Sequence, residues 1–156
     1  MDSGPKEIEL KLRVSPENMA TLRTHPNFAE SLGEPVKETL VSVYFDSDEF
    51  FLRDHGLTLR VRHIGDKRIQ TIKSAEHGTF ERSEWEQTIE GDHPHLALVT
   101  DTALGPLLTD DIRNSLKLVF ETRIERTVYR LNGGDTDIAV AFDEGRIVGT
   151  ALAANL

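Results

Sequence analysis

The sequence predicts an α+β fold in which antiparallel strands dominate and a few helices flank them. Short runs of alternating apolar and polar residues recur along the chain, and turn signals such as Asn132–Gly133–Gly134 separate them. Helical features are confined to residues 15–25, one short turn, and a region near residues 94–116. Several strands also carry one face made largely of Arg, Lys and Glu. If the sheet closes into an antiparallel β-barrel with these faces inward, the apolar faces lie outside under the flanking helices.

The first strand is expected over residues 6–14, which have the sequence KEIELKLRV. Two-residue alternation places the apolar side chains on one face and the charged side chains on the other. The charged face carries Glu7, Glu9, Lys11 and Arg13. Two acids followed by two bases raise the question whether this face meets water or lines a site.

A helix is expected to follow over residues 15–25. Ser15 is a candidate N-cap, Pro16 suits the first helical position, and Glu17 favours the N-terminal end. A single helical turn is predicted for the segment FFLRDHG, which Gly56 closes.

Six further strands are expected at alternating runs between turn signals. In chain order they are ETLVSVYFDS, LTLRVRHI, RIQTIKS, RSEWEQTI, LVFETRIERTVYRL and TDIAVAFDEGRI.

Parity places charged side chains together on several of these strands. The predicted inward set on the later strands consists of Arg60, Arg62, Lys73, Arg82, Glu84, Glu86, Arg126 and Arg130. A single charged face is usually just solvated, but its recurrence on several strands favours a shared site. Trp85 has the opposite parity and is expected to pack under a helix.

Composition limits the classes of function. The chain has 156 residues, enough for one domain with its own core, and no cysteine for disulfides or thiolate chemistry. Its net charge of −9 argues against a nucleic-acid partner held by a general basic surface. No stretch is long enough to span a membrane, and the N-terminus is too acidic for a signal peptide, so we expect a cytoplasmic protein without membrane contact.

A tunnel lined by cations and carboxylates suits a polyanion accompanied by divalent cations. Arg and Lys hold phosphate oxygens, Arg bidentately, and paired carboxylates hold Mg²⁺ or Mn²⁺. His93 and His95 are a weaker candidate for a metal pair, because Pro94 between them favours a solvated turn.

At the level of motifs the chain resembles the CYTH domain, or triphosphate tunnel metalloenzyme, family. EIELK matches the E-x-E-x-K signature of that family, and the match continues in order through YFDSDEFFLRDHGLTLRVR, TIKS, ERSEWE, VFETRIERTVY and AFDEGRI. The spacing is similar to that of the bacterial inorganic triphosphatase branch. The resemblance implies an antiparallel barrel that encloses a triphosphate, with a single domain over residues 1–156.

The same resemblance implies roles for individual residues. Metal-binding carboxylates are expected at Glu7, Glu9, Glu84 and Glu86, and triphosphate-binding cations at Lys11, Arg60, Arg62, Lys73 and Arg126. Glu7, Glu9 and Lys11 are expected to take part in catalysis, with Mg²⁺ or Mn²⁺ as cofactor. The implied ligand is a triphosphate or polyphosphate.

Relatives also carry a further strand with a second E-x-E pair, whereas this chain ends in VGTALAANL. We therefore expect a barrel that lacks its final strand, and a homodimer formed through the unpaired edge. In many relatives a helical polyphosphate-binding domain follows, and we expect one in the full-length protein.

The function expected from these residues is metal-dependent hydrolysis of inorganic triphosphate to diphosphate and phosphate. Two alternatives stay open. One is a class IV adenylate cyclase or a thiamine or nucleoside triphosphatase, and the other is a phosphate-binding module without turnover.

Overall fold

A computed structural model describes residues 10–149, apart from 76–81, and residues 153–155. It divides into two compact units, which are treated separately. The first comprises Met1–Pro35 and Tyr129–Val140, and the second comprises Val36–Val128 and Ala141–Leu156. No helix in the described ranges is both long enough and apolar enough to cross a membrane.

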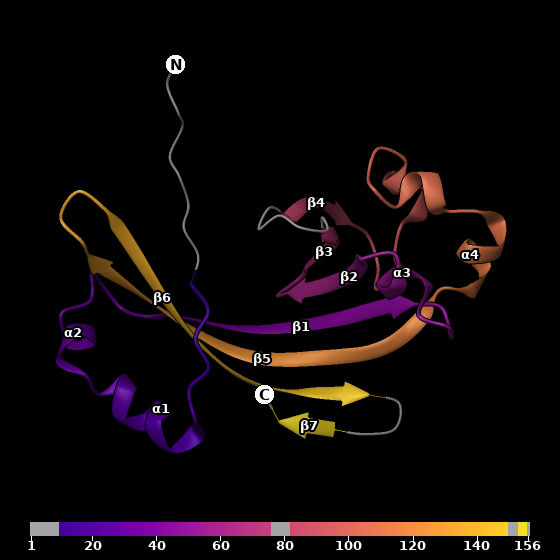
Figure 1. Cartoon of the computed structure of the whole chain (residues 1–156). Helices are drawn as coiled ribbons and strands as arrows, with labels where there is room; N and C mark the ends of the chain where they lie inside the picture. The colour runs from indigo at the N-terminus through magenta and orange to yellow at the C-terminus, as the bar shows by residue number, and fades with distance from the viewer. Residues whose placement is uncertain (1–9, 76–81, 150–152, 156) are drawn as a thin grey trace. The chain divides into compact units, whose positions relative to one another are not determined.

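Antiparallel strands dominate the chain, as predicted. They are β1 (Val36–Asp46), β2 (Leu57–Ile64), β3 (Lys67–Ala75), β4 (Arg82–Ile89), β5 (Lys117–Asn132), β6 (Asp137–Gly149) and β7 (Ala153–Asn155). Their order in the sheet is β4-β3-β2-β1-β5-β6-β7 (Figure 1). Within the described residues no ladder joins β4 to β7, so the hydrogen-bonded sheet is open. The sequence did not predict the short β7, which pairs with the end of β6.

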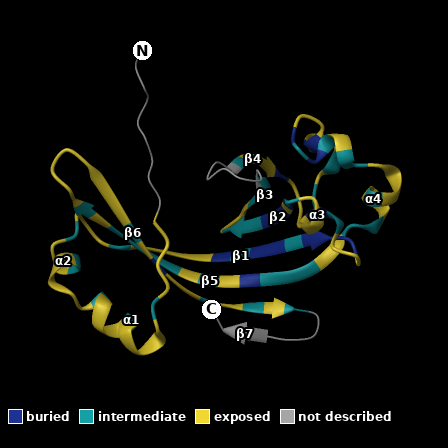
Figure 2. Cartoon of the chain, viewed as in Figure 1, coloured by how far each residue is buried: buried dark blue, intermediate teal, exposed yellow. Residues whose placement is uncertain are grey.

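One face of the sheet in the second unit carries the main hydrophobic core. Leu59, Val61 and Ile72 are almost fully buried on β2 and β3, together with Val43 and Phe45 of β1. In Figure 2 the buried residues are concentrated in these strands and in the segments beside them. The apolar face predicted for β2 is therefore confirmed.

Short helices supply the other half of that core. They are α3 (Phe51–Asp54), the 3₁₀ helices η1 (Leu96–Val99) and η2 (Gly105–Leu107), and α4 (Asp110–Ser115). Leu52, Val99 and Leu104 are buried from this side, and Trp85 packs against the cluster as expected. The region predicted as helical near residues 94–116 is thus broken into short turns. At Gly105 a Cβ atom would clash with the carbonyl oxygen of Thr100, so the chain passes too closely there for an ordinary side chain.

The predicted single turn between β1 and β2 forms as α3. It ends at Gly56, which has a φ of +69°, a value that glycine adopts readily. Asp46, at the end of β1, is buried, and its carboxylate accepts hydrogen bonds from the backbone amides of Ser47, Leu52 and Arg53. These bonds satisfy amides that a helix start leaves without partners.

Asp46→Ala is expected to destabilise the protein by about 1–3 kcal/mol, because three amides lose a charged acceptor in a buried place. Urea denaturation followed by circular dichroism measures the change. Asp48→Asn is the control, since Asp48 is 80% exposed and only pairs with Lys117. Equal denaturation midpoints for Asp46→Ala and the unchanged protein would contradict this role.

The first unit contains α1 (Pro16–Arg23) and α2 (Pro26–Ala29), neither of which has a buried residue. The predicted helix is confirmed in α1, although the Ser15 hydroxyl does not cap the backbone. Instead Ser15 hydrogen-bonds to the Glu17 carboxylate and lowers the pKa of that group. Within the unit, the rings of Phe28 and Tyr129 are in contact, with centroids 5.1 Å apart.

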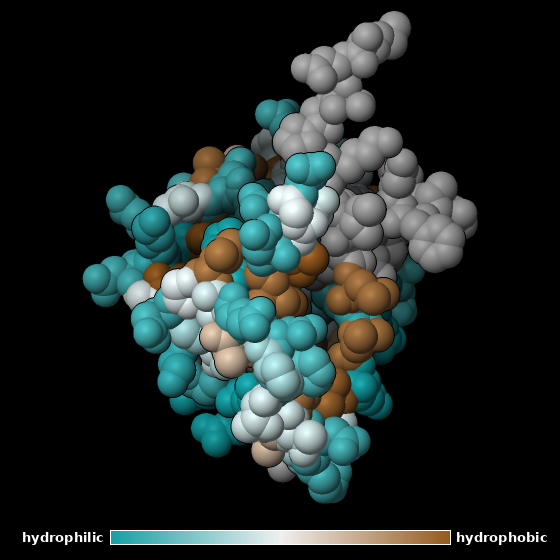
Figure 3. Space-filling view, turned by 90° about the vertical axis from the view of Figure 1, so that its left-hand side faces the viewer, coloured by the Kyte–Doolittle hydropathy of each residue, from teal (hydrophilic) through white to brown (hydrophobic). Residues whose placement is uncertain are grey.

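The strand predicted over residues 6–14 does not form in its described part. Residues 10–14 are irregular, and Leu10 and Leu12 are 79% and 78% exposed. Alternation gives a strand its two faces, but a strand becomes stable only when it pairs and buries one of them. Figure 3 shows hydrophobic side chains exposed among hydrophilic ones on one side of the molecule. The residues of the first unit that expose large apolar side chains are Leu10, Leu12, Leu22, Leu32 and Ile138.

Candidate functional site

Six of the predicted site residues share the face of the sheet opposite the core. They are Arg60, Arg62, Lys73, Glu84, Glu86 and Arg126, and we call them the ionic face. Antiparallel pairing aligns them in cross-strand rows, because directly opposed residues point to the same side of a sheet. One row runs from Glu86 through Thr71 to Arg60, and the next joins Glu84 to Lys73.

Arg60 lies at the centre of one ion-pair network. Its side chain is buried, and its Nη2 atom donates to Thr71 Oγ1 at 2.9 Å. The same nitrogen lies 3.6 Å from Glu86 Oε1 and 3.8 Å from Glu84 Oε1. Thr71 in turn donates its hydroxyl to Glu86 Oε1 at 3.2 Å. A fixed, partly neutralised guanidinium therefore stands beside two carboxylates.

Lys73 and Glu84 form the neighbouring pair, with Lys73 Nζ 2.9 Å from Glu84 Oε2. Burial acts to raise the pKa of Glu84, but the hydrogen bond and charge of Lys73, together with Arg60, lower it on balance. Glu84 is therefore ionised at neutral pH, and its charge is shared between two cations.

Arg126 is held on β5 by an acid that the sequence analysis did not include. Its Nε and Nη2 atoms donate to the two carboxylate oxygens of Asp143 on β6, each at 2.7 Å. This bidentate geometry fixes the plane of the guanidinium. Asp143 has the same parity as Ala139 and Ala141 on β6, so following that alternation along the strand would have found it.

Arg62 differs from the other cations of the ionic face. It is half-buried and donates from Nε to Ser42 Oγ at 3.0 Å. Among the described residues no carboxylate lies within ion-pair distance of its guanidinium. Burial, followed by the charge of Arg60, lowers the pKa of Arg62. Arg62 is therefore a cation in a site that disfavours positive charge.

Two hydroxyl residues complete this part of the face, and the sequence analysis included neither of them. Ser42 on β1 pairs directly with Arg62 on β2 and with Thr122 on β5. Both hydroxyl residues are buried. Their parity within each strand was the available signal, but Ser and Thr among apolar residues are typical of any strand.

The structure does not test the N-terminal candidates. Glu7 and Glu9 lie outside the described residues, and so does the side chain of Arg82. Lys11 is exposed in the irregular segment of the first unit. Their predicted roles stay predictions.

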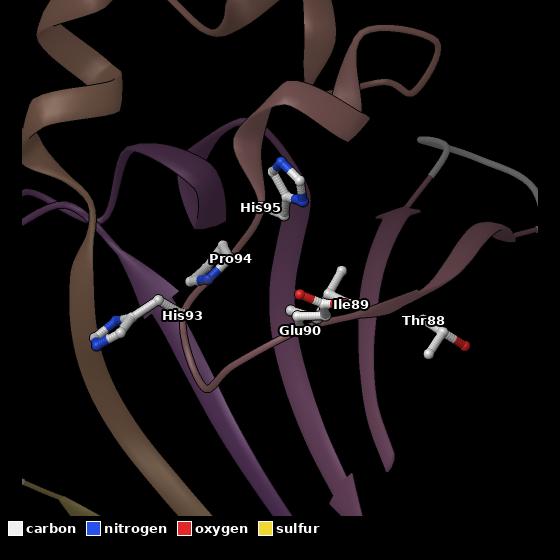
Figure 4. A pocket seen from close by; sticks show the side chains of 6 residues that line it. All are labelled: Thr88, Ile89, Glu90, His93, Pro94 and His95. Carbon is white, nitrogen blue, oxygen red and sulfur yellow. The ribbon is translucent and has the colours of Figure 1, made fainter.

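A hollow of about 600 Å³ lies elsewhere, in the loop after β4 (Figure 4). It is lined by Thr88, Ile89, Glu90, His93, Pro94 and His95, and by no residue of the ionic face. The imidazole rings of His93 and His95 point in different directions, so they do not form a metal-binding pair. Chemistry suited to phosphate therefore lies on the ionic face and not in this hollow.

The described residues do not complete a metal site on their own. They contain no group of three or more His, Cys, Asp or Glu side chains that could hold a metal ion. Glu84 and Glu86 offer carboxylate oxygens of the kind that Mg²⁺ or Mn²⁺ prefers, but both already lie beside Arg60.

Comparison with known proteins agrees with this arrangement. A family model described as the CYTH domain matches residues 5–152. A presumed adenylyl cyclase from Hippeastrum, described as revealing a dominant triphosphatase activity, has 19% identity and a TM-score of 0.57, over 85% of this chain and 69% of that chain. A presumed adenylate cyclase from Bacillus halodurans has 17% identity and a TM-score of 0.53, over 91% of this chain and 73% of that chain. At these identities the likeness is one of fold.

Proposed function

The chain belongs to the CYTH domain family, and from this premise we propose that it is a metal-dependent triphosphatase. Its substrate is inorganic triphosphate, which it hydrolyses to diphosphate and phosphate. The family and the names of its structural neighbours support chemistry on a triphosphate group, and the choice of inorganic triphosphate rests on the motif spacing described above.

The charge of the ionic face is the observation that carries this proposal. The six residues and Asp143 supply four cations and three carboxylates, and Glu38 of β1, directly opposite Arg126, adds a fourth carboxylate to this face, in a chain whose net charge is −9. Cations are thus concentrated at one place, and Arg62 has no carboxylate to neutralise it in the described part of the chain. A bound polyanion would supply the missing negative charge.

The cations of the ionic face bind the substrate, and neighbouring carboxylates orient two of them. Arg62 and Arg60 bind phosphoryl oxygens and stabilise the charge that builds up as the bond to the terminal phosphorus breaks. Asp143 and Glu84 orient Arg126 and Lys73 beside them. A water molecule attacks the terminal phosphorus in line with the leaving diphosphate, and its proton passes to a base that we do not assign.

Mg²⁺ or Mn²⁺ is the cofactor in this proposal. When bound to the phosphates it neutralises their charge and polarises the phosphorus–oxygen bonds. Glu84 and Glu86 supply too few free oxygens for a site of their own, so Glu7, Glu9 and substrate oxygens complete the ligand set. Lys11 joins the cations that bind the substrate.

Orthophosphate release from a panel of triphosphates tests the proposal. Inorganic triphosphate, ATP and thiamine triphosphate are each incubated with the protein and Mg²⁺ or Mn²⁺. We expect the highest kcat/KM with inorganic triphosphate. Formation of cyclic AMP and diphosphate from ATP would instead establish the cyclase alternative, which the name of the Bacillus halodurans neighbour favours. Binding without release of any product would establish the non-catalytic alternative.

Removal of divalent metal is expected to abolish turnover. A triphosphate carries several negative charges, which the cations of the ionic face do not neutralise without a metal ion, because carboxylates on the same face already offset their charge. Orthophosphate release is measured in EDTA, then after Mg²⁺ or Mn²⁺ is restored in excess. Activity that persists in EDTA would show that the side chains act alone.

A further inference from the structure

The row formed by Arg62, Ser42 and Thr122 contains two groups whose protein contacts are incomplete. Ser42 is 1% exposed and Thr122 is 7% exposed, so neither hydroxyl is in open contact with solvent. The Thr122 hydroxyl has no hydrogen-bond partner among the described residues. The Arg62 guanidinium in the same row has no carboxylate partner there. A buried polar group without a partner costs stability, which native proteins rarely accept without a reason.

The three residues come from adjacent strands and face the same side of the sheet. Ser42 Oγ accepts the Nε–H of Arg62 at 3.0 Å, so the Nη groups of the guanidinium are left for another partner. Thr122, paired with Ser42 from the opposite strand, brings a hydroxyl donor to the same row. Arg60, one row away, has a buried Nε atom without a hydrogen-bond partner among the described atoms. Several donors with incomplete partners thus lie on one patch.

We propose that the Thr122 hydroxyl and Ser42 extend the binding site around Arg62 into a subsite for one phosphoryl group of the substrate. Arg62 supplies the charge, and the Thr122 hydroxyl donates a hydrogen bond to a phosphoryl oxygen. Ser42 is a positioning residue, which fixes the guanidinium of Arg62 through Nε. The inference rests on the proposed function, because the triphosphate provides the phosphoryl group. It adds two neutral residues to a site otherwise made of charges.

An oxyanion would complete both groups at once. It accepts the unused hydroxyl hydrogen of Thr122, and its charge relieves the repulsion that Arg62 experiences from Arg60. In the absence of a ligand, the unpaired Thr122 hydroxyl and the Arg62 charge lower the stability of the folded protein. Thr122→Val should therefore lower the affinity for the ligand and leave the stability of the ligand-free protein unchanged or higher.

Calorimetric titration with the imido analogue of triphosphate, in which nitrogen replaces the bridging oxygens, tests the subsite without turnover. The titration is run with and without Mg²⁺. Thr122→Val is expected to raise the Kd about tenfold, the effect of one hydrogen bond to a charged group. Thr122→Ser keeps the hydroxyl and should retain affinity. Thr127→Val is the control, because Thr127 lies on the same strand with the opposite parity.

Ser42 is tested through its dependence on Arg62. Ser42→Ala should weaken binding of the analogue in the unchanged protein and have no further effect in an Arg62→Gln background. Additive effects of the two substitutions would show that Ser42 does not act through Arg62. Urea denaturation of each variant separates loss of affinity from loss of folding.

The outcomes separate this inference from the proposed function. A Thr122→Val protein that binds the analogue as well as the unchanged protein does overturns the subsite. Binding that depends on Thr122, without orthophosphate release from triphosphate, supports the subsite and overturns hydrolysis. Failure of the unchanged protein to bind the analogue in either condition overturns both.

Discussion

Arg62→Gln is expected to lower kcat/KM for triphosphate by about 100- to 1,000-fold, the usual effect of removing one group that stabilises charge in a transition state. Arg62 has no carboxylate partner among the described residues, so its charge is available to the substrate without displacing another ion. The measurement is steady-state orthophosphate release at saturating Mg²⁺.

The same substitution should leave stability unchanged or slightly higher. Burial and the charge of Arg60 both lower the pKa of Arg62, which means that the folded protein disfavours the charged form. A neutral amide removes that cost, although Ser42 loses a donor. Arg123→Gln is the matched control, because Arg123 lies on the opposite face of β5 and pairs with Glu121. A clear loss of stability in Arg62→Gln, with activity retained, would assign Arg62 a structural role.

Sequence alternation correctly predicted the strands that pair with a neighbour close in the chain. Strands β2, β3 and β4 are consecutive in the chain and pair in that order, and the turn between β2 and β3 has Gly65 at a φ of +56°. Each strand therefore pairs with a neighbour close in sequence, and parity alone decides which side chains face the core. Trp85 and Arg60 both lie on the predicted faces for this reason.

Alternation failed where pairing is distant or absent. The segment around Lys11 has a strong strand pattern, but nothing in its own sequence supplies the edge that it needs. The opposite failure occurred at β7, where small side chains give no alternating signal although backbone pairing to β6 still forms. In the candidate site, Ser42, Thr122 and Asp143 were missed because a single hydroxyl or acid in a strand has many ordinary explanations.

Arg60→Met is expected to reduce both activity and stability, in contrast to Arg62→Gln. Loss of a substrate cation should lower kcat/KM about 100-fold. The Arg60 side chain also holds Thr71, Glu86 and Glu84 together through a single nitrogen, Nη2. Methionine replaces its volume but removes the donor to Thr71 and the positive charge beside the two glutamates.

The stability loss should be about 1–2 kcal/mol, below the several kcal/mol typical of breaking a fully buried ion pair. The reason is that Glu84 and Glu86 are 39% and 52% exposed, so water can replace Arg60 around them. Adding Glu86→Gln removes the carboxylate that Arg60→Met leaves without a cation, since Glu84 keeps its pairing with Lys73. The second substitution should therefore restore part of the stability and none of the activity. Urea denaturation and orthophosphate release on the single and double variants measure both effects. Recovery of activity in the double variant would mean that Arg60 serves only to neutralise Glu86, and that the triphosphate is bound without it.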